Sequence, residues 1–506
     1  MGSFIIRLIV PLAIYIPVLF LAFILIYSLF IVYSRRRYAH FPQPKTFRFF
    51  SGHAEYQVVK RVGLIEKWLQ QYGNIICLHT YHITRILVLD PAIVKEILTN
   101  NEHKKLRYYF LERIFGERFL GRSILTEWDN TLWNLKRKRL NKAFHKSTLQ
   151  QMVDQFDSCA NSFINHLEPM ADGKNVIQMV DKLGLVTEDI IAKVGFGLHL
   201  DVYKEDGVTF DNALTETFRL KWIHAMPQWF SYPPFGKGLK QRNRSRLACR
   251  ILRKFGRDCI MKRLENSKNN DETPNDLLHY ILQEYTMDES LFSPDWFENI
   301  VDEFVTFFVA VFLCTGNETT SSLLSFTLIL LGRHPDVQRK VQLEIDEVID
   351  GKKDIEYHDL LKLKYLSMVF KEVLRIHPPV HSSIRKLSSE LTLNGFKFAK
   401  GTLVQFPHSL ISRLEKYYKN PLEFHPERWT DSKLTESNNF NYQYFPFSAG
   451  PRICIGKDFA LIEARIITAR LIGRFNIRLE KYDVDGVTVG GTTRPKDCLV
   501  TLTARQ

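Results

Sequence analysis

Paired cysteines are missing from this sequence. It contains 7 cysteines in 506 residues, an odd number, and no two of them form a CxxC pair. A disulfide framework and a zinc module both depend on such pairs, so both are excluded and a reducing compartment is expected. The chain also lacks an internal repeat and a long Gly/Ser linker, which argues against a solenoid and against a string of separate domains.

The chain has fewer acidic than basic residues. The chain has 69 Lys and Arg against 55 Asp and Glu, a formal net charge of +14. This surplus favours an anionic partner, which is nucleic acid, a phospholipid surface or an acidic protein. No nucleic-acid-binding motif is present and the basic residues are dispersed, so no nucleic acid partner is predicted. With 45% hydrophobic and 13% aromatic residues, the composition is that of a globular protein with a large apolar core.

Charged residues are absent from Leu8–Tyr33, a run that is rich in Leu, Ile, Phe and Tyr. As a helix it would be roughly 39 Å long, enough to cross a hydrocarbon core of about 30 Å. Three arginines at 35–37 follow, which predicts a cytoplasmic location for the rest of the chain. A cleaved signal peptide is the alternative, but the run is too long and no small-residue cleavage site follows. We therefore predict a transmembrane anchor at 1–34 and a basic, proline-containing hinge at 35–52.

Residues 53–506 are expected to form one body that is mainly α with a small β portion. Amphipathic helical periodicity recurs in Leu132–His145, Ser147–Leu167, Lys182–Phe196, Leu247–Glu265 and Pro335–Ile349. Short strand-like alternations occur in Ile75–Thr80, Ile86–Leu89, Leu391–Phe398 and Leu499–Thr503.

One apolar stretch is too long for an ordinary surface helix. It begins at Ser293, an N-cap followed by proline, and extends to Gly332. Two apolar runs, Phe304–Leu313 and Leu323–Leu331, flank a polar patch at 315–320. A second membrane span is the alternative, but neither run reaches about 18 residues and the patch contains Asn and Glu. The pattern favours a core helix whose polar break is the place for function.

A short segment near the carboxyl end carries the most specific pattern. Residues Phe447 to Gly456 read FSAGPRICIG, a Gly-rich turn that presents Cys454 just before a helix. The helix N-terminus and Arg452 would stabilise a Cys454 thiolate, a suitable axial ligand of haem iron. A buried structural cysteine is the alternative. The pattern FxxGxRxCxG resembles the haem-binding loop of the cytochromes P-450. This resemblance implies Cys454 as the metal ligand, Phe447 and Gly456 as cofactor-binding residues, and haem b as the cofactor.

Other motifs extend this resemblance over about residues 42–506 and imply the cytochrome P-450 fold with an N-terminal transmembrane anchor helix. Trp133 and Arg137 form a WxxxR arrangement whose residues bind a haem propionate in the family, and Arg385 and Arg452 resemble the other propionate partners. Cations that face a dicarboxylate are chemically sensible. For Trp133 and Arg137 considered alone, ordinary packing on a helix surface is the alternative.

A second set of residues resembles a scaffold network of the family. Glu372 and Arg375 lie one helical turn apart, and Arg428 follows in the sequence PERW. Considered alone, such a pair is a solvated surface contact worth roughly a few tenths of a kcal/mol. The resemblance implies instead a buried Glu-Arg-Arg network around the cysteine loop, with a structural role.

The polar patch of the long helix, GNETT from Gly316, resembles the oxygen-activation motif of the family. The resemblance implies that Glu318 and Thr319 are catalytic residues that position water and deliver protons. The family has Ala or Gly before this glycine, whereas this chain has Thr315, the last residue of an insertion, Val311–Thr315. Such an insertion leaves roughly 140° of helical misregister unless a bulge absorbs it. A local distortion and impaired oxygen chemistry are the two hypotheses.

Three further blocks look like the cholesterol 24-hydroxylase branch: Ile114–Arg118 with Gly121, Asp302–Phe308, and Tyr365–Ser367. They imply a sterol hydroxylase of the endoplasmic reticulum membrane that uses O2 and NADPH-derived electrons from a reductase. The predicted partners are this reductase, the lipid bilayer and a lipophilic substrate. Docking of an acidic reductase on a basic surface of this chain accounts for the positive net charge. A fatty-acid hydroxylase of the same family is one alternative. A haem-binding protein with activity impaired by the insertion is the other.

Overall fold

Contacts divide the chain into two units in the computed structural model. One unit comprises Met1–Lys104 with Ser382–Leu410, and the other comprises Lys105–His381 with Ile411–Gln506. The residues that the structure describes are 2–45, 48–53, 62–100, 102–103, 120–198, 237–269, 274–286, 296–309, 317–349, 352–431, 440–484, 487–489 and 492–505.

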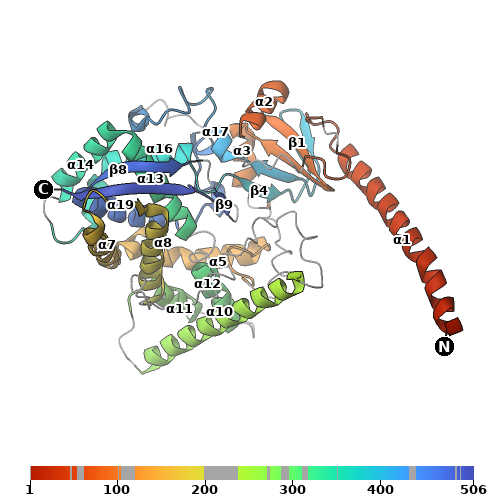
Figure 1. Cartoon of the computed structure of the whole chain (residues 1–506), viewed down its shortest axis with the longest axis horizontal. Coiled ribbons are helices and arrows are strands. Elements are labelled where there is room, and N and C mark those ends of the chain that lie inside the picture. The colour runs from red at the N-terminus through yellow and green to blue at the C-terminus, as the bar shows by residue number, and fades with distance from the viewer. Residues whose placement is uncertain are drawn as a thin grey trace. The chain divides into compact units, whose positions relative to one another are not determined.

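The first unit contains a four-stranded sheet built from two distant parts of the chain. β1 (Ile75–Thr80) and β2 (Ile83–Val88) form an antiparallel hairpin. β2 pairs in parallel with β7 (Leu403–Phe406), which pairs antiparallel with β4 (Ser383–Lys386). Figure 1 shows β1 and β4 in this sheet. The strand predicted at Ile75–Thr80 is confirmed, and the one predicted from Ile86 begins three residues earlier.

The sequence predicts one strand-like stretch over Leu391–Phe398, but the structure contains a hairpin there. β5 (Leu391–Leu393) and β6 (Phe396–Phe398) pair antiparallel. Asn394 and Gly395 between them have φ values of 48° and 78°. An Asn-Gly pair with positive φ at both positions forms a tight turn that reverses the chain. The prediction of one stretch is therefore wrong, because it overlooked the turn residues.

α1 (Gly2–Arg36) contains the predicted anchor segment. Among the residues that the structure describes, one helical stretch is long and apolar enough to cross a membrane, Pro17–Arg36, with a mean hydropathy of 2.3. At the carboxyl end of α1, the hydroxyl of Ser34 donates to the carbonyl of His82 at 3.0 Å, so the helix contacts the β1–β2 turn. The other helices before β4 are α2 (Val62–Tyr72) and α3 (Pro91–Thr99).

Described residues of the predicted hinge, 35–52, contact the strands of the first unit. Phe41 is buried, with its ring centre 5.1 Å from that of Phe398 in β6. The N–H of Cys77 in β1 donates to the carbonyl of Pro42 at 2.8 Å. These contacts tie the segment that follows α1 to the strands of this unit. The predicted boundaries at residues 34 and 52 stay predictions.

The second unit is mainly helical, as predicted. Besides two core helices, its described helices are α5 (Asn130–Ala143), α6 (Lys146–Gln150), α7 (Val153–Leu167), α8 (Met179–Ile190), α10 (Lys237–Lys268), α11 (Leu277–Thr286), α14 (Pro335–Ile349), α15 (Tyr357–Lys362), α16 (Lys364–Ile376) and α19 (Lys457–Arg474). The short helix α17 (His408–Ile411) spans the boundary between the two units in the chain. α14 has the predicted bounds. The helix predicted over Ser147–Leu167 is divided between α6 and α7, because the backbone of Met152 (φ −108°, ψ 2°) leaves the helical region.

Two small sheets complete the second unit. β3 (Ile177–Gln178), β11 (Asp497–Ala504) and β8 (Phe475–Asp483) form an antiparallel sheet, and β9 (Val487–Val489) pairs with β10 (Thr492–Arg494). Figure 1 shows β8 beside α13 and α19.

α13 (Asn317–Arg333) forms the core of the second unit, because nearly all of its described side chains are apolar or small and are buried. An added Cβ on Gly332 would lie 2.7 Å from Leu479 of β8, so helix and sheet approach closely there. α12 (Trp296–Val309) precedes it, so both halves of the predicted long helix are helical. The start of that prediction and the insertion, Val311–Thr315, lie outside the described residues.

Acidification is expected to destabilise both units. Burial lowers the pKa of His79 in the first unit to about 4, and in the second unit it lowers the pKa of His377 to about 3 and of His381 to about 4. In the unfolded chain the histidine pKa values are near 6.5. Between about pH 4 and pH 6.5 the unfolded chain therefore binds more protons than the folded chain. The stability that these neutral histidines contribute is therefore complete above about pH 6.5 and is lost as the pH falls toward 4.

Thermal unfolding at about pH 7.5 and about pH 5 measures this effect, and the midpoint should fall by several degrees at the lower pH. His377→Phe should reduce the fall, because a phenyl ring keeps the stacking on Phe326 (ring centres 4.4 Å apart) without a proton to bind. The exposed His358 provides the control, since His358→Phe should leave the fall unchanged. Equal acid sensitivity of the two variants would contradict the proposed role of burial.

Candidate active site

Backbone hydrogen bonds hold the loop that carries Cys454. Gly450 has a φ of 71°, a conformation that glycine adopts without strain, and it opens a 3₁₀ turn at Gly450–Arg452. The N–H of Cys454 donates to the carbonyl of Phe447 at 2.9 Å. Ser448 has a φ of 65°, which is strained for a residue with a side chain. The loop thus has a specific backbone conformation that presents the Cys454 side chain.

Cys454 differs from the other cysteines that the structure describes. Its side chain is exposed, whereas the rest are buried or half-buried, and burial raises the pKa of each of those thiols; they are Cys77, Cys159, Cys249, Cys259 and Cys498. Cys454 also lies three residues before α19, whose N-terminus favours a nearby negative charge. The alternative of a buried structural cysteine is therefore excluded.

Arg137 reaches the cysteine loop from α5. Its Nη1 donates to the carbonyl of Ile453 at 2.8 Å. Burial lowers the pKa of the Arg137 guanidinium, and negative charge on Cys454 opposes this shift. This electrostatic interaction between Arg137 and Cys454 favours the thiolate over the thiol.

Arg452 and Trp133 stack beside the same loop. The centre of the buried Arg452 guanidinium lies 3.8 Å from the centre of the Trp133 ring, a close cation–π contact. Arg452 donates from Nη2 to Oδ1 of Asn130 at 2.8 Å. Trp133 donates from Nε1 to the carbonyl of Ile124 at 3.1 Å. Trp133, Arg137 and Arg452 are thus gathered at the loop, where these hydrogen bonds are made to protein groups.

Gly456 leaves space beside the cysteine. Its φ of −85° is open to any residue, and an added Cβ would meet no atom within 4 Å. Neither the backbone nor the neighbouring protein atoms require glycine there, and its role as a cofactor-binding residue stays a prediction. Phe447, the other residue predicted for the pocket, is half-buried and packs against the core of the second unit.

Arg385 lies in β4 of the first unit, whereas the residues above belong to the second unit. Its side chain is buried, and Nη1 donates to the carbonyl of Ile384 at 3.1 Å. The role of Arg385 as a propionate partner stays a prediction.

Glu318 and Thr319 lie in the first turn of α13. Thr319 is half-buried, and the next residue, Thr320, is buried. Thr320 shares a hydrogen bond with the carboxyl group of Glu463 in α19, where burial raises the pKa of Glu463 to about 8. The predicted catalytic turn is therefore joined to the helix that follows Cys454. The catalytic roles of Glu318 and Thr319 stay predictions.

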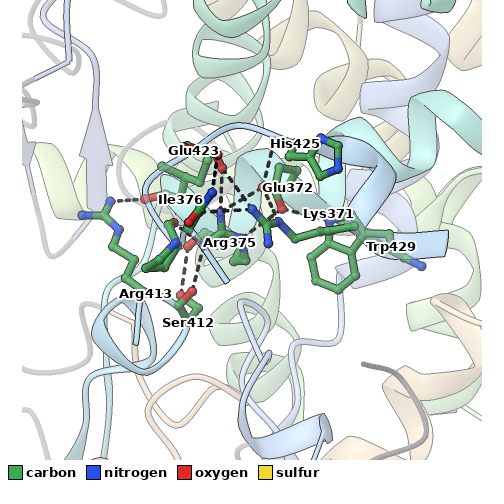
Figure 2. Close-up of polar contacts among 12 residues, drawn as sticks. Lys371, Glu372, Arg375, Ile376, Ser412, Arg413, Glu423, His425 and Trp429 are labelled. Atoms are coloured by element: carbon green, nitrogen blue, oxygen red, sulfur yellow. Dashed lines mark hydrogen bonds and ion pairs between the residues drawn. The ribbon is translucent and has the colours of Figure 1, made fainter. Parts of the chain in front are cut away.

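Glu372 is the centre of a buried hydrogen-bond network, shown in Figure 2. Arg375, one turn along α16, donates from Nε and Nη2 to the two Glu372 oxygens at 2.9 and 2.8 Å. Arg428 donates from Nε at 2.8 Å, and Trp429 donates from Nε1 at 3.0 Å. The predicted network of Glu372, Arg375 and Arg428 is confirmed, and Trp429 is a member that sequence reasoning missed.

Arg375 also binds the chain that leads toward the cysteine loop. It donates from Nη1 to the carbonyl of Ser412 at 3.0 Å and from Nη2 to the carbonyl of Glu423 at 3.1 Å. The hydroxyl of Ser412 in turn donates to the carbonyl of Arg375 at 2.9 Å. Figure 2 shows these contacts around the fully buried guanidinium of Arg375. The network therefore fastens residues 412–429 to α16.

Comparison with known proteins decides the family. The family model for cytochrome P450 matches residues 42–492. The chain belongs to the cytochrome P450 family. It is 28% identical to cytochrome P450 4d2 of Drosophila melanogaster, over 82% of this chain and 83% of that protein. It is 30% identical to cytochrome P450 72A552 of Barbarea vulgaris (81% and 77%) and 27% identical to cytochrome P450 3A13 of Mus musculus (81% and 80%).

Cytochromes P450 are monooxygenases that hold haem through a cysteine thiolate, so this chain is an enzyme of that class. The described residues fit such a group. An exposed thiol at a helix N-terminus is flanked by the cations Arg137 and Arg452, and Gly456 leaves room beside it. A thiolate with nearby guanidinium groups is the donor set that an iron porphyrin with two carboxylates needs.

Two buried carboxyl groups of this P450 were missed by sequence reasoning. Glu303 in α12 and Glu463 in α19 are each at most 3% exposed, and burial raises the pKa of Glu303 to about 7 and of Glu463 to about 8. Buried acids of this kind need specific partners. The sequence does contain a signal for such a group, which is an acidic residue within an apolar helical run. Glu303 ends the sequence IVDE, and Glu463 ends the sequence FALIE.

Proposed function

We propose that this P450 is a membrane-anchored monooxygenase that hydroxylates a sterol, with O2 as the oxidant and electrons from NADPH through a reductase. The observation that carries the proposal is the Cys454 thiol, which is exposed in a hydrogen-bonded loop and adjoined by Arg137. Cholesterol 24-hydroxylase-like specificity is the finer part of the proposal and comes from the blocks that resemble that branch.

Cys454 is assigned as the residue whose thiolate would bind the iron of haem b, with Phe447 and Gly456 in its pocket. When bound, haem supplies the redox centre at which O2 is split and one oxygen atom enters a C–H bond. Guanidinium and indole groups neutralise and orient the propionates. The residues assigned to this task are Trp133, Arg137, Arg385 and Arg452.

Glu318 and Thr319 are assigned to proton delivery, because cleavage of O2 consumes protons in a site that excludes bulk water. The hydrogen bond between Thr320 and Glu463 supports this assignment, since it holds the first turn of α13 against α19. With its pKa raised to about 8, Glu463 keeps a proton at neutral pH, so the bond brings no buried negative charge to this turn.

A reductase with an acidic surface is the proposed electron donor. Burial lowers the pKa of Lys371 in α16, as does the positive charge of Arg465 and Lys457, so these three cations are neighbours. Lys371 and Lys457 are exposed, and Lys457 begins the helix that follows the cysteine loop. A basic patch beside the haem ligand is complementary to an acidic protein.

α1 is proposed to anchor the enzyme in the endoplasmic reticulum membrane. The uncharged run Leu8–Tyr33 is long enough to cross the bilayer, and the arginines at 35–37 remain on the cytoplasmic side. The hydrogen bond from Ser34 to the carbonyl of His82 joins the β1–β2 turn to the carboxyl end of α1, which supports a position of this turn near the membrane surface.

Two of the branch-like blocks on which the sterol assignment rests are in contact. Gly121 has a φ of 52°, and an added Cβ would lie 1.9 Å from Cγ of Asp302. Position 121 needs glycine because Asp302 fills the space, so the two blocks occur together for a physical reason. Thr315 stands where many fatty-acid hydroxylases carry a glutamate that forms an ester with haem, so no such ester is expected.

A binding titration is expected to separate the two substrate classes. Cholesterol should change the haem absorbance of the purified full-length protein, and a long-chain fatty acid should need a roughly tenfold higher concentration. With a reductase present, cholesterol should also stimulate the consumption of NADPH. Tighter binding of the fatty acid, with NADPH consumption, would replace the sterol proposal with the fatty-acid one.

A haem-binding protein with impaired oxygen chemistry is the second candidate, and the insertion Val311–Thr315 favours it. Under this candidate, haem and sterol still bind but no substrate stimulates the consumption of NADPH. The same titration therefore distinguishes all three functions.

A further inference from the structure

Two adjacent carboxylates are buried in α12, the helix that precedes the predicted oxygen-activation turn. Asp302 and Glu303 are both completely buried. Burial raises the pKa of Glu303 to about 7, against the opposing effects of Lys136 and of the Ile124 N–H. Burying a carboxyl group is costly unless hydrogen bonds compensate, so the partners of this pair indicate its task.

Glu303 binds the turn that precedes α5. The N–H of Ile124 donates to both Glu303 oxygens, at 3.0 and 2.9 Å. Nζ of Lys136 lies 3.6 Å from Oε1 of Glu303 and also donates to the carbonyl of Arg122. The carboxylate and the lysine therefore clamp the backbone of residues 122–124 from two sides.

Asp302 holds the same turn one step earlier. Its Oδ2 accepts from the N–H of Arg122 at 2.9 Å, and its Oδ1 accepts from Nη1 of Arg253 at 2.7 Å. Gly121 lies directly against this carboxylate, since an added Cβ would be 1.9 Å from it. The turn is thus bound to α12 at two successive positions.

The far side of the turn leads to the cysteine. The carbonyl of Ile124 accepts from Nε1 of Trp133 at 3.1 Å. The ring of Trp133 lies 3.8 Å from the guanidinium centre of Arg452, and Arg452 is two residues before Cys454. Ile124 therefore joins two groups. Its N–H binds a carboxylate in α12, and its carbonyl binds the stack that borders the cysteine loop.

We infer that Glu303 is a positioning residue: through Ile124 and Trp133 it holds Arg452 in place and so fixes the conformation of the cysteine loop. The inference rests on the proposed role of Cys454 as the haem ligand. Glu303 touches neither Cys454 nor Arg452, and its effect passes through three contacts that each have a described geometry. It makes α12, the helix that precedes the predicted oxygen-activation turn, a support for the loop that carries Cys454.

Hydrogen exchange of the full-length holoprotein tests this inference. Glu303→Ala removes both acceptors of the Ile124 N–H, and exchange should become roughly tenfold faster in residues 120–129 and also in the cysteine loop, 447–456. Glu303→Gln keeps one acceptor oxygen and should give a smaller increase in both segments. If the alanine variant does not fold, the glutamine variant carries the test by itself.

Glu344→Gln is the matched control. Glu344 of α14 also accepts from two backbone N–H groups, those of Tyr365 and Leu366 at 2.6 and 2.9 Å, but has no described contact with the cysteine loop. This variant should leave exchange in 447–456 unchanged.

A spectroscopic readout accompanies the exchange measurement. With carbon monoxide bound to the reduced protein, the thiolate-type absorbance band should convert to the neutral-ligand band faster in the Glu303 variants than in wild type or Glu344→Gln. Faster exchange confined to 120–129, or no change in either segment, overturns the inference. If wild type has no thiolate-type band, the proposed function fails, but the exchange result still decides whether Glu303 supports the loop.

Discussion

Replacing Cys454 with serine is expected to abolish the thiolate-type absorbance band of the reduced, carbon-monoxide-bound protein and to reduce substrate oxidation below detection. Serine is nearly isosteric, but its hydroxyl does not ionise in the range where a thiol beside Arg137 and a helix N-terminus does. A thiolate ligand would supply the electron density that O2 cleavage at the haem needs, and a serine hydroxyl would not.

The measurement is the carbon monoxide difference spectrum of membranes that contain the full-length protein, together with haem content per polypeptide. Cys259→Ser is the control, because Cys259 is a half-buried thiol of α10 outside the cysteine loop. This variant should keep the wild-type band. A thiolate-type band in Cys454→Ser would show that another cysteine holds the iron and would end the assignment of the site.

Replacing Glu372 with alanine is expected to cost about 3–5 kcal/mol of folding stability, the loss measured when one partner of a buried ion pair is removed. Arg375 is fully buried, and Arg428 donates to the same carboxylate, so the variant strands guanidinium charge in the interior. Such a loss is a large part of the 5–15 kcal/mol that stabilises an average domain. The unfolding midpoint should fall on the order of 10 °C.

Haem retention should fall in parallel, because Arg375 also fastens the carbonyl groups of Ser412 and Glu423 on the chain that leads to the cysteine loop. Thermal unfolding followed by circular dichroism and by haem absorbance measures both effects. Glu427→Gln is the matched control: this glutamate stands beside Arg428 but is partly exposed and pairs with Lys340, so its loss should cost less than about 1 kcal/mol. Similar midpoints for the two variants would contradict the structural role of the network.

The local motifs of the site were predictable because each lies within one short segment. The backbone of Gly450 and the following 3₁₀ turn present Cys454 through contacts inside the loop itself. The pairing of Glu372 with Arg375 follows from the spacing of one helical turn. The uncharged run in α1 needs only helical rise and bilayer thickness to be interpreted.

Misjudged boundaries have equally local causes. Asn394 and Gly395 form the turn between β5 and β6. The apolar alternation on both sides of this two-residue signal obscured it in the sequence. The break between α6 and α7 depends on the backbone of Met152, which an amphipathic pattern does not reveal.

The sequence by itself predicted the family, which the family model confirms, because motif spacing acts over a few turns of chain. The Cys454 ligand and the membrane anchor come from the same local patterns and stay predictions. Only the tertiary structure decided what the buried acids do. Glu303 meets Ile124 across 179 residues of sequence, and Glu463 meets Thr320 between two helices. A carboxyl group in an apolar helix signals that a partner must exist, since its burial is otherwise too costly, but the partner is chosen by how the helices pack.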